Sequence, residues 1–218
     1  MRYALFDWDG TLVDSMPFWY GLPERYCRDK GVAYFPEVGR VIGSYTMVQA
    51  AEAMTRMLPL NQTPQQTFAE LKQIVRKAYW EEIPLKPDVL DTLRAFHDAG
   101  VRMGIASASD KELITCTLPR LGIEGFIDVV CTCTDTGDGR GKEDSPEVYR
   151  ECLRRLGGNP TSPEQAVIFD DALFAARTAA AAGFTVAGVY EPTNARQDEL
   201  KQVCRYYFRG ADEWRALV

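Results

Sequence analysis

The sequence predicts an α/β fold, in which a parallel sheet carries helices on both faces and a helical segment is inserted after the first strand. From Val101 onward, short apolar runs alternate with helical segments, a pattern typical of parallel sheets covered on both faces. Between Ser15 and Pro84, apolar residues recur only at helical spacing. The 218 residues suffice for one core and a small inserted domain.

The first strand is predicted at Tyr3–Phe6, and two carboxylates follow it directly. In an extended chain Asp7 and Asp9 point to the same side, and two anions held so close call for a cation. An ionised Asp can attack phosphorus once a hard divalent cation neutralises the phosphate, and a second carboxylate can protonate the leaving oxygen. The alternative is a polar, turn-forming loop, since short motifs are weak without context.

Apolar residues predict three helices in the insert. The three sets are Phe18, Leu22 and Tyr26; Val48, Ala51, Met54 and Leu58; and Phe68, Leu71, Ile74, Val75 and Ala78. Thr63-Pro64 is a suitable cap and first turn for the third helix. We expect a core domain of residues 1–14 and 87–218 and a helical domain of residues 15–86.

The remaining chain predicts the rest of the sheet and its helices. A helix is expected near residues 88–99, and residues 195–217 predict two weaker helices. Between them the predicted strands are Val101–Ser107, Ile127–Thr132, Ala166–Phe169 and Thr185–Val189, and the predicted helices are Asp110–Leu121, Ser145–Leu156 and Leu173–Ala182.

Polar side chains gather where the predicted strands end. They are Asp7 and Asp9 after the first strand, Ser107 at the end of the second, Lys142 in the loop before the helix at 145, and Asp170 and Asp171 after the fourth. Each has a structural explanation as a helix cap or a solvated loop charge. Ligands of open parallel sheets bind beyond the carboxyl ends of the strands, so the four occurrences together favour a functional site.

The residue types suit phosphoryl transfer. A phosphoryl group in transit spreads negative charge over its oxygens, so catalysis needs positioned donors and cations. Ser107 supplies a hydroxyl and Lys142 a point charge. The carboxylates of Asp170 and Asp171, with Asp7, offer the oxygen ligands that Mg²⁺ prefers, and Asp9 completes the candidate metal set.

The run from Asp7 to Ser15, D-x-D-G-T-L-V-D-S, resembles the first motif of the haloacid dehalogenase-like hydrolase superfamily, in its phosphatase branch. Ile105–Ser109, Gly141-Lys142 and Ile168–Asp171 look like motifs two, three and four in the family's order. The resemblance implies a Rossmann-like sheet with an inserted helical cap domain of type C1, as in the subfamily that includes beta-phosphoglucomutase. It also implies that Asp7 is the nucleophile and Asp9 the acid/base.

The resemblance predicts a Mg²⁺-dependent phosphatase that hydrolyses a small phosphorylated metabolite through an aspartyl-phosphate intermediate. The alternatives are a sugar phosphomutase and, less favoured, a non-catalytic metabolite-binding relative. The insert segment Val41–Ala53 contains no basic residue for a second phosphate, although Arg40 and Arg56 flank it, which favours the phosphatase. Asp9 argues against a dehalogenase, which does not need a second Asp to protonate its leaving group.

Composition limits the classes of partner and metal site that we expect for this protein. A net charge of -6 argues against nucleic acid or an anionic membrane, and no run approaches transmembrane length or forms a signal peptide, so a cytoplasmic enzyme is expected. Six cysteines with one histidine make a poor zinc set. Cys131 and Cys133 are predicted on one strand face as buried thiols, and His97 on a solvated helix surface. Monomer and dimer both stay open.

Overall fold

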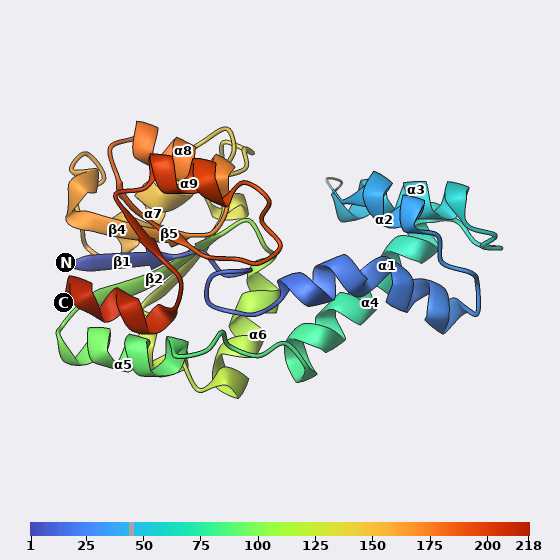
Figure 1. The fold of residues 1–218 in the computed structure, drawn as a ribbon, viewed down its shortest axis with the longest axis horizontal. Coiled ribbons are helices and arrows are strands. Elements are labelled where there is room, and N and C mark those ends of the chain that lie inside the picture. The colour runs from blue at the N-terminus through green and yellow to red at the C-terminus, as the bar shows by residue number, and fades with distance from the viewer. Residues whose placement is uncertain (44–45) are drawn as a thin grey trace. The chain divides into compact units, whose positions relative to one another are not determined.

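The structure, a computed structural model, describes residues 1–43 and 46–218, which divide into two compact units (Figure 1). The core unit comprises Met1–Asp14 and Pro84–Val218, and the helical unit comprises Ser15–Ile83. The chain returns to the core unit at Pro84 rather than after residue 86, because Leu85 forms an antiparallel bridge with Val13. Ser44 and Tyr45, within the segment that weighs against a mutase, lie outside the described residues.

A six-stranded sheet forms the centre of the core unit, with the strand order β3-β2-β1-β4-β5-β6 and every pairing parallel. The strands are β1 (Tyr3–Phe6), β2 (Arg102–Ser107), β3 (Val129–Thr132), β4 (Ala166–Asp170), β5 (Thr185–Val189) and β6 (Tyr206–Phe208). The predicted parallel sheet is confirmed. Residues 195–217 contain the two predicted helices, α9 (Gln197–Val203) and the 3₁₀ helix η4 (Ala211–Leu217). The strand β6 between them was not predicted, because three residues are too few to show a periodic pattern.

Helices cover both faces of the sheet, as predicted. Their bounds are α5 (Val89–Asp98), α6 (Lys111–Leu121), α7 (Glu147–Arg155), α8 (Leu173–Ala181) and α9 (Gln197–Val203), with short 3₁₀ helices η1 (Glu124–Phe126), η2 (Cys133–Asp135), η3 (Pro163–Gln165) and η4 (Ala211–Leu217). Figure 1 shows α7, α8 and α9 on one face and α5, α6 and the C-terminal η4 on the other. This layered arrangement holds the strand ends at fixed positions.

Apolar side chains fill both interfaces between sheet and helices. Leu5 packs in a cluster with residues of α7, α8 and α9, whereas Phe6 points to the opposite face. On that face the Phe6 and Phe169 rings lie 4.9 Å apart, and the Phe169 ring lies 4.8 Å from Trp214. The first and fourth strands are therefore anchored from both sides immediately before the carboxylates that follow them.

The helical unit contains α1 (Met16–Lys30), α2 (Pro36–Ile42), α3 (Met47–Met57) and α4 (Pro64–Glu81). The three predicted helices correspond to α1, α3 and α4, and α2 was not predicted. Thr63 opens α4 as expected: its hydroxyl accepts from the Gln66 amide, and the Gln66 side chain accepts from the Thr63 amide. Val48 does not belong to the buried set, because it is 53% exposed.

Two predictions about single residues have different outcomes. The Asp135 carboxylate accepts from the Thr132 amide and starts η2, so Cys133 lies beyond β3 and does not share a strand face with buried Cys131. Cys133 is only half-buried. His97 lies on the exposed surface of α5, as predicted. Within residues 1–43 and 46–218, no helix has the length and apolar character needed to cross a membrane.

Candidate active site

The candidate site lies where the winding of the sheet reverses, between β1 and β4. Phe6 pairs with Phe169, so the residues that follow them, Asp7 and Asp170, are adjacent at the carboxyl edge of the sheet. The Asp7 amide donates to the Phe169 carbonyl at 2.8 Å, which extends the pairing by one residue. This reversal point is where open parallel sheets bind ligands.

Lys142 comes from the loop before α7 and joins the two carboxylates. Its Nζ lies 2.6 Å from Asp7 Oδ1 and 2.8 Å from Asp170 Oδ2, and its side chain is only 3% exposed. Burial alone would lower the pKa of Lys142, but Asp170 and Asp7 outweigh burial and raise this pKa well above its usual value. The structure therefore holds a buried, charged ammonium group against Asp7.

Asp170 is occupied by protein donors on both of its oxygens. Besides Lys142, the Tyr149 hydroxyl donates to Asp170 Oδ2 at 3.1 Å, and the Ala172 amide donates to Oδ1 at 2.9 Å. Burial raises the pKa of Tyr149 well above its usual value, so the hydroxyl keeps its proton and remains a donor. These contacts suit Asp170 to holding Lys142 in place.

Asp171 packs against the loop that follows β1. The Thr11 hydroxyl donates to Asp171 Oδ1 at 3.0 Å. Gly10 has a φ of +77°, and a Cβ there would lie 2.6 Å from Asp171 Oδ2. A side chain at position 10 would therefore suffer both backbone strain and a collision with the carboxylate. The collision explains why position 10 is glycine, and the hydrogen bond to Asp171 explains the hydroxyl group at position 11.

Asp9 and Ser107 meet the site through the end of β2. The Ser109 hydroxyl donates to Asp9 Oδ2, and the Ser109 amide donates to Ser107 Oγ at 3.1 Å. Ser107 is buried at the end of the strand next to β1, where its hydroxyl accepts this local bond. The predicted residues thus lie at three neighbouring strand ends and the Lys142 loop, and their catalytic roles stay predictions.

Three carboxylates could hold a metal ion: Asp7, Asp170 and Asp171 each offer an oxygen within 4.8 Å of the others. Among the described residues this cluster does not include Asp9, whose role as a ligand stays a prediction. Burial raises the pKa of Asp7 to about 7, with Asp170 adding to the rise and Lys142 opposing it. Burial, Asp7 and Asp170 likewise raise the pKa of Asp171 well above its usual value.

Three carboxylates lie together in this cluster, and in the described part of the chain the one ammonium group that pairs with them is that of Lys142, so negative charge is in excess. A hard divalent cation would relieve the excess, and carboxylate oxygens are its preferred ligands. The residues present therefore fit a Mg²⁺ ion.

The residues predicted from the sequence do not include Thr11, Ser109 and Tyr149, whose hydroxyl groups donate to carboxylates of predicted residues. The first two lie within the motif-like runs at the ends of β1 and β2, so their position next to candidate residues was an available signal. Tyr149 carries no such signal, because it lies on α7 among ordinary core positions and meets Asp170 only in the folded chain.

A sequence model of the haloacid dehalogenase-like hydrolases matches residues 1–183. A fructose-1-phosphate phosphatase of Escherichia coli (strain K12) is 25% identical over 191 residues, covering 86% of this chain and 97% of the relative. A phosphorylated carbohydrates phosphatase of Thermotoga maritima is 22% identical over 183 residues, covering 84% of this chain and 82% of the relative.

Solved structures share the fold. A candidate beta-phosphoglucomutase from Thermotoga maritima superposes with a TM-score of 0.85 at 21% identity, covering 100% of this chain and 98% of the other. The fold class and the hydrolase class predicted from the sequence are thereby confirmed. Since the family match spans residues 1–183, well over half of the chain, and includes the ends of β1, β2, β3 and β4, the chain belongs to the haloacid dehalogenase-like hydrolases.

Proposed function

We propose that this protein is a Mg²⁺-dependent phosphatase that hydrolyses a small phosphorylated metabolite through a phosphorylated Asp7. The observation that carries the proposal is the pairing of Asp7 with buried Lys142, 2.6 Å away, at the reversal point of the sheet. A carboxylate held beside a cation is placed to meet a phosphoryl group, whose charge needs such a partner.

In the first step an Asp7 oxygen attacks phosphorus while the bond from phosphorus to the substrate oxygen breaks. Protonated Asp9 gives its proton to the departing alkoxide, and product alcohol leaves. In the second step Asp9 takes a proton from water as the water oxygen attacks phosphorus. The bond between phosphorus and Asp7 then breaks, which releases inorganic phosphate and restores both carboxylates to their starting states.

The other residues stabilise charge and geometry. Lys142 faces the phosphoryl oxygens with a fixed positive charge, and Asp170 with Tyr149 keeps its ammonium group in position. Ser107 offers a hydroxyl from the neighbouring strand end. A Mg²⁺ ion held by Asp7 and Asp171, with Asp170 and Asp9 as further candidate ligands, would neutralise substrate phosphate when bound.

Phosphorylated sugars are the substrates that we expect first, because the two relatives described above are named for fructose 1-phosphate and phosphorylated carbohydrates. We infer that the helical unit is a cap that shapes access to the site and thereby selects among these substrates. We further infer a cytoplasmic location, where sugar phosphates are available.

The deciding experiment measures phosphate release from a panel of sugar phosphates and an aryl phosphate, with Mg²⁺ and with chelator. Asp7→Asn should lower turnover by about 10³-fold or more, the scale on which covalent catalysis is lost. Asp98→Asn, the same change on the exposed surface of α5, should match the unmodified protein. Metal-independent release, or release that persists in Asp7→Asn, would contradict the mechanism. Isomerised sugar phosphate without free phosphate would identify a mutase instead.

A further inference from the structure

Lys86 lies where the chain has returned to the core unit, and its ammonium group is saturated. Nζ donates to the Gly10 carbonyl at 2.5 Å, to the Tyr190 carbonyl at 3.1 Å and to the Glu191 carboxylate at 2.7 Å. A lysine ammonium carries three donors, so these acceptors use all of them. The side chain is 14% exposed. Lys86 is therefore built to hold protein groups together, since it has no donor left for a ligand.

Glu191 makes the other half of this buried ion pair. Its side chain is 2% exposed, and its second oxygen accepts from the Thr193 amide at 3.2 Å and from the Thr193 hydroxyl at 3.0 Å. Buried ion pairs add little net stability compared with apolar packing, although breaking one is costly. The pair does have a geometric effect, because it ties the loop after β5 to the loop after β1.

Asn194 extends the same tie to the loop after β4. Its Nδ2 donates to the Asp171 carbonyl at 2.7 Å. Its Oδ1 accepts from the Arg196 amide at 2.8 Å, and its backbone amide donates to the Glu191 carbonyl at 3.0 Å. These two local bonds fix the orientation of the Asn194 side chain, and with it the direction of the Nδ2 donor. The loop after β5 thus reaches the peptides of both carboxylate-bearing loops.

We propose that Lys86, Glu191 and Asn194 are positioning residues for the active site, an inference that rests on the proposed phosphatase function. They fix the Gly10 and Asp171 peptides against each other across three strand ends. Gly10 leaves no space for even a methyl group beside the Asp171 carboxylate, so the two loops pack closely at this point. Small displacements of catalytic groups are costly because catalysis depends on their alignment.

The test compares Asn194→Asp with Asn159→Asp. Asn159 is a matched control, because its Oδ1 also accepts from the amide two residues onward, at Thr161, in an exposed loop of the core unit. Both variants keep that turn and add one negative charge, but only Asn194→Asp replaces the donor to the Asp171 carbonyl with an acceptor. Asn194→Ser and Asn159→Ser remove the side-chain amide without adding charge, and serine can keep the local turn.

Two readouts are measured on the full chain: steady-state kinetics, and the Mg²⁺ concentration that gives half of the maximal rise in melting temperature. Both Asn194 variants should lower kcat about tenfold and raise the half-saturating Mg²⁺ concentration about tenfold, as outer contacts of metal ligands do elsewhere. KM for substrate should stay within about twofold, because the phosphate-binding side chains are unchanged. The thermal readout needs no turnover.

Equal kcat and equal Mg²⁺ dependence in the Asn194 and Asn159 variants would overturn the inference, while leaving the phosphatase proposal intact. A fall in melting temperature with no change in either readout would show a merely structural contact and would also overturn it. Absence of phosphate release and of Mg²⁺-induced stabilisation in the unmodified protein would instead refute the proposed function, together with the positioning role that rests on it.

Discussion

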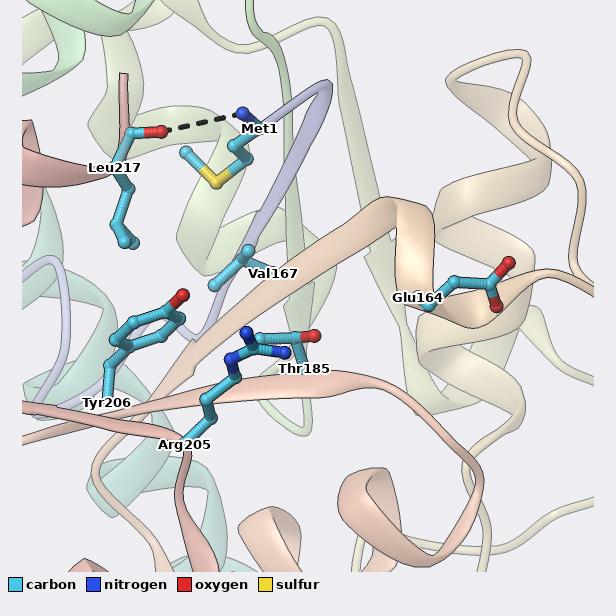
Figure 2. A pocket seen from close by; sticks show the side chains of 7 residues that line it. All are labelled: Met1, Glu164, Val167, Thr185, Arg205, Tyr206 and Leu217. Atoms are coloured by element: carbon cyan, nitrogen blue, oxygen red, sulfur yellow. Dashed lines mark hydrogen bonds between the residues drawn. The ribbon is translucent and has the colours of Figure 1, made fainter.

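The two ends of the sheet differ in the burial of their charged side chains. At the carboxyl end, Lys142, Asp7 and Asp170 are buried and joined at 2.6 and 2.8 Å. At the amino end, a shallow hollow of about 230 Å³ carries Arg205 and Glu164 on its exposed rim. Figure 2 shows this hollow, which is lined by Met1, Glu164, Val167, Thr185, Arg205, Tyr206 and Leu217.

The difference indicates which end does chemistry. Buried charges cost several kcal/mol each unless they are paired, so a chain keeps them where they serve a function. Arg205 and Glu164 remain in contact with water and avoid this cost. We therefore expect the chemistry at the carboxyl end, where the charged side chains are buried and paired.

The largest effect is expected for Lys142→Met. This change removes the cation from Asp7 and Asp170. In the proposed mechanism it also withdraws positive charge from the reacting phosphoryl group. We expect kcat/KM to fall by about 10²- to 10³-fold, or about 3 to 4 kcal/mol, the usual loss of a transition-state donor. Steady-state kinetics check this result. Lys201→Met, which removes an exposed lysine paired with Asp198, is the control, and a loss below tenfold for Lys142→Met would break the contrast.

Tyr149→Phe tests whether the Tyr149 hydroxyl helps Asp170 to hold the Lys142 ammonium group in position. Losing the hydroxyl leaves Asp170 Oδ2 with Lys142 but without its second donor, at a distance of 3.1 Å in the intact protein. Hydrogen bonds to charged groups contribute about 1.5 to 3 kcal/mol, so we expect kcat to fall about tenfold. Tyr26→Phe is a matched control, since Tyr26 also donates to a carboxylate, that of Glu70, within the helical unit. Equal kinetics for both variants would assign Tyr149 to stability alone.

The site residues that were predicted from the sequence are those whose neighbours in the chain identify them. Asp7 and Asp9 follow one apolar run directly, Asp171 follows another, and Lys142 lies in the loop before a predicted helix. Tyr149 and Asn194 were not predicted, because their partners lie 21 and 23 residues away in the chain and the contacts exist only after folding. The strand β6 was missed for a related reason: three residues give no period, and its pairing with β5 defines it.

Asp135 tests a carboxylate of intermediate burial at the end of β3. Burial opposes its ionisation, but hydrogen bonds from Thr132 and Lys111 outweigh burial and lower its pKa to about 2. A lowered pKa contributes stability above the ordinary value near 4, and this contribution is lost as pH falls from 4 through 2. Asp135→Asn should therefore cost about 1 to 2 kcal/mol at pH 7, allowing for partial solvent screening.

Urea unfolding of both proteins at pH 7, 5 and 3 measures this difference. The gap in unfolding free energy should be the same at pH 7 and 5 and should shrink at pH 3, where the native carboxylate begins to lose its advantage. A gap that does not change with pH would show that packing, rather than ionisation of Asp135, sets its contribution.

The smallest effect is expected at the amino end, for Arg205→Gln. The Arg205 guanidinium lies over the Tyr206 ring, 5.6 Å from its centroid, in an exposed position where such contacts contribute about 0.5 kcal/mol. Its removal should change the unfolding free energy by no more than about 0.5 kcal/mol and leave kcat/KM within about twofold. Glu164→Gln, on the same rim, should behave alike. Neither side chain lies at the carboxyl edge, so a tenfold change in kcat from either variant would mean that the two ends of the sheet are energetically coupled. Charge burial would then be an insufficient guide to the active site.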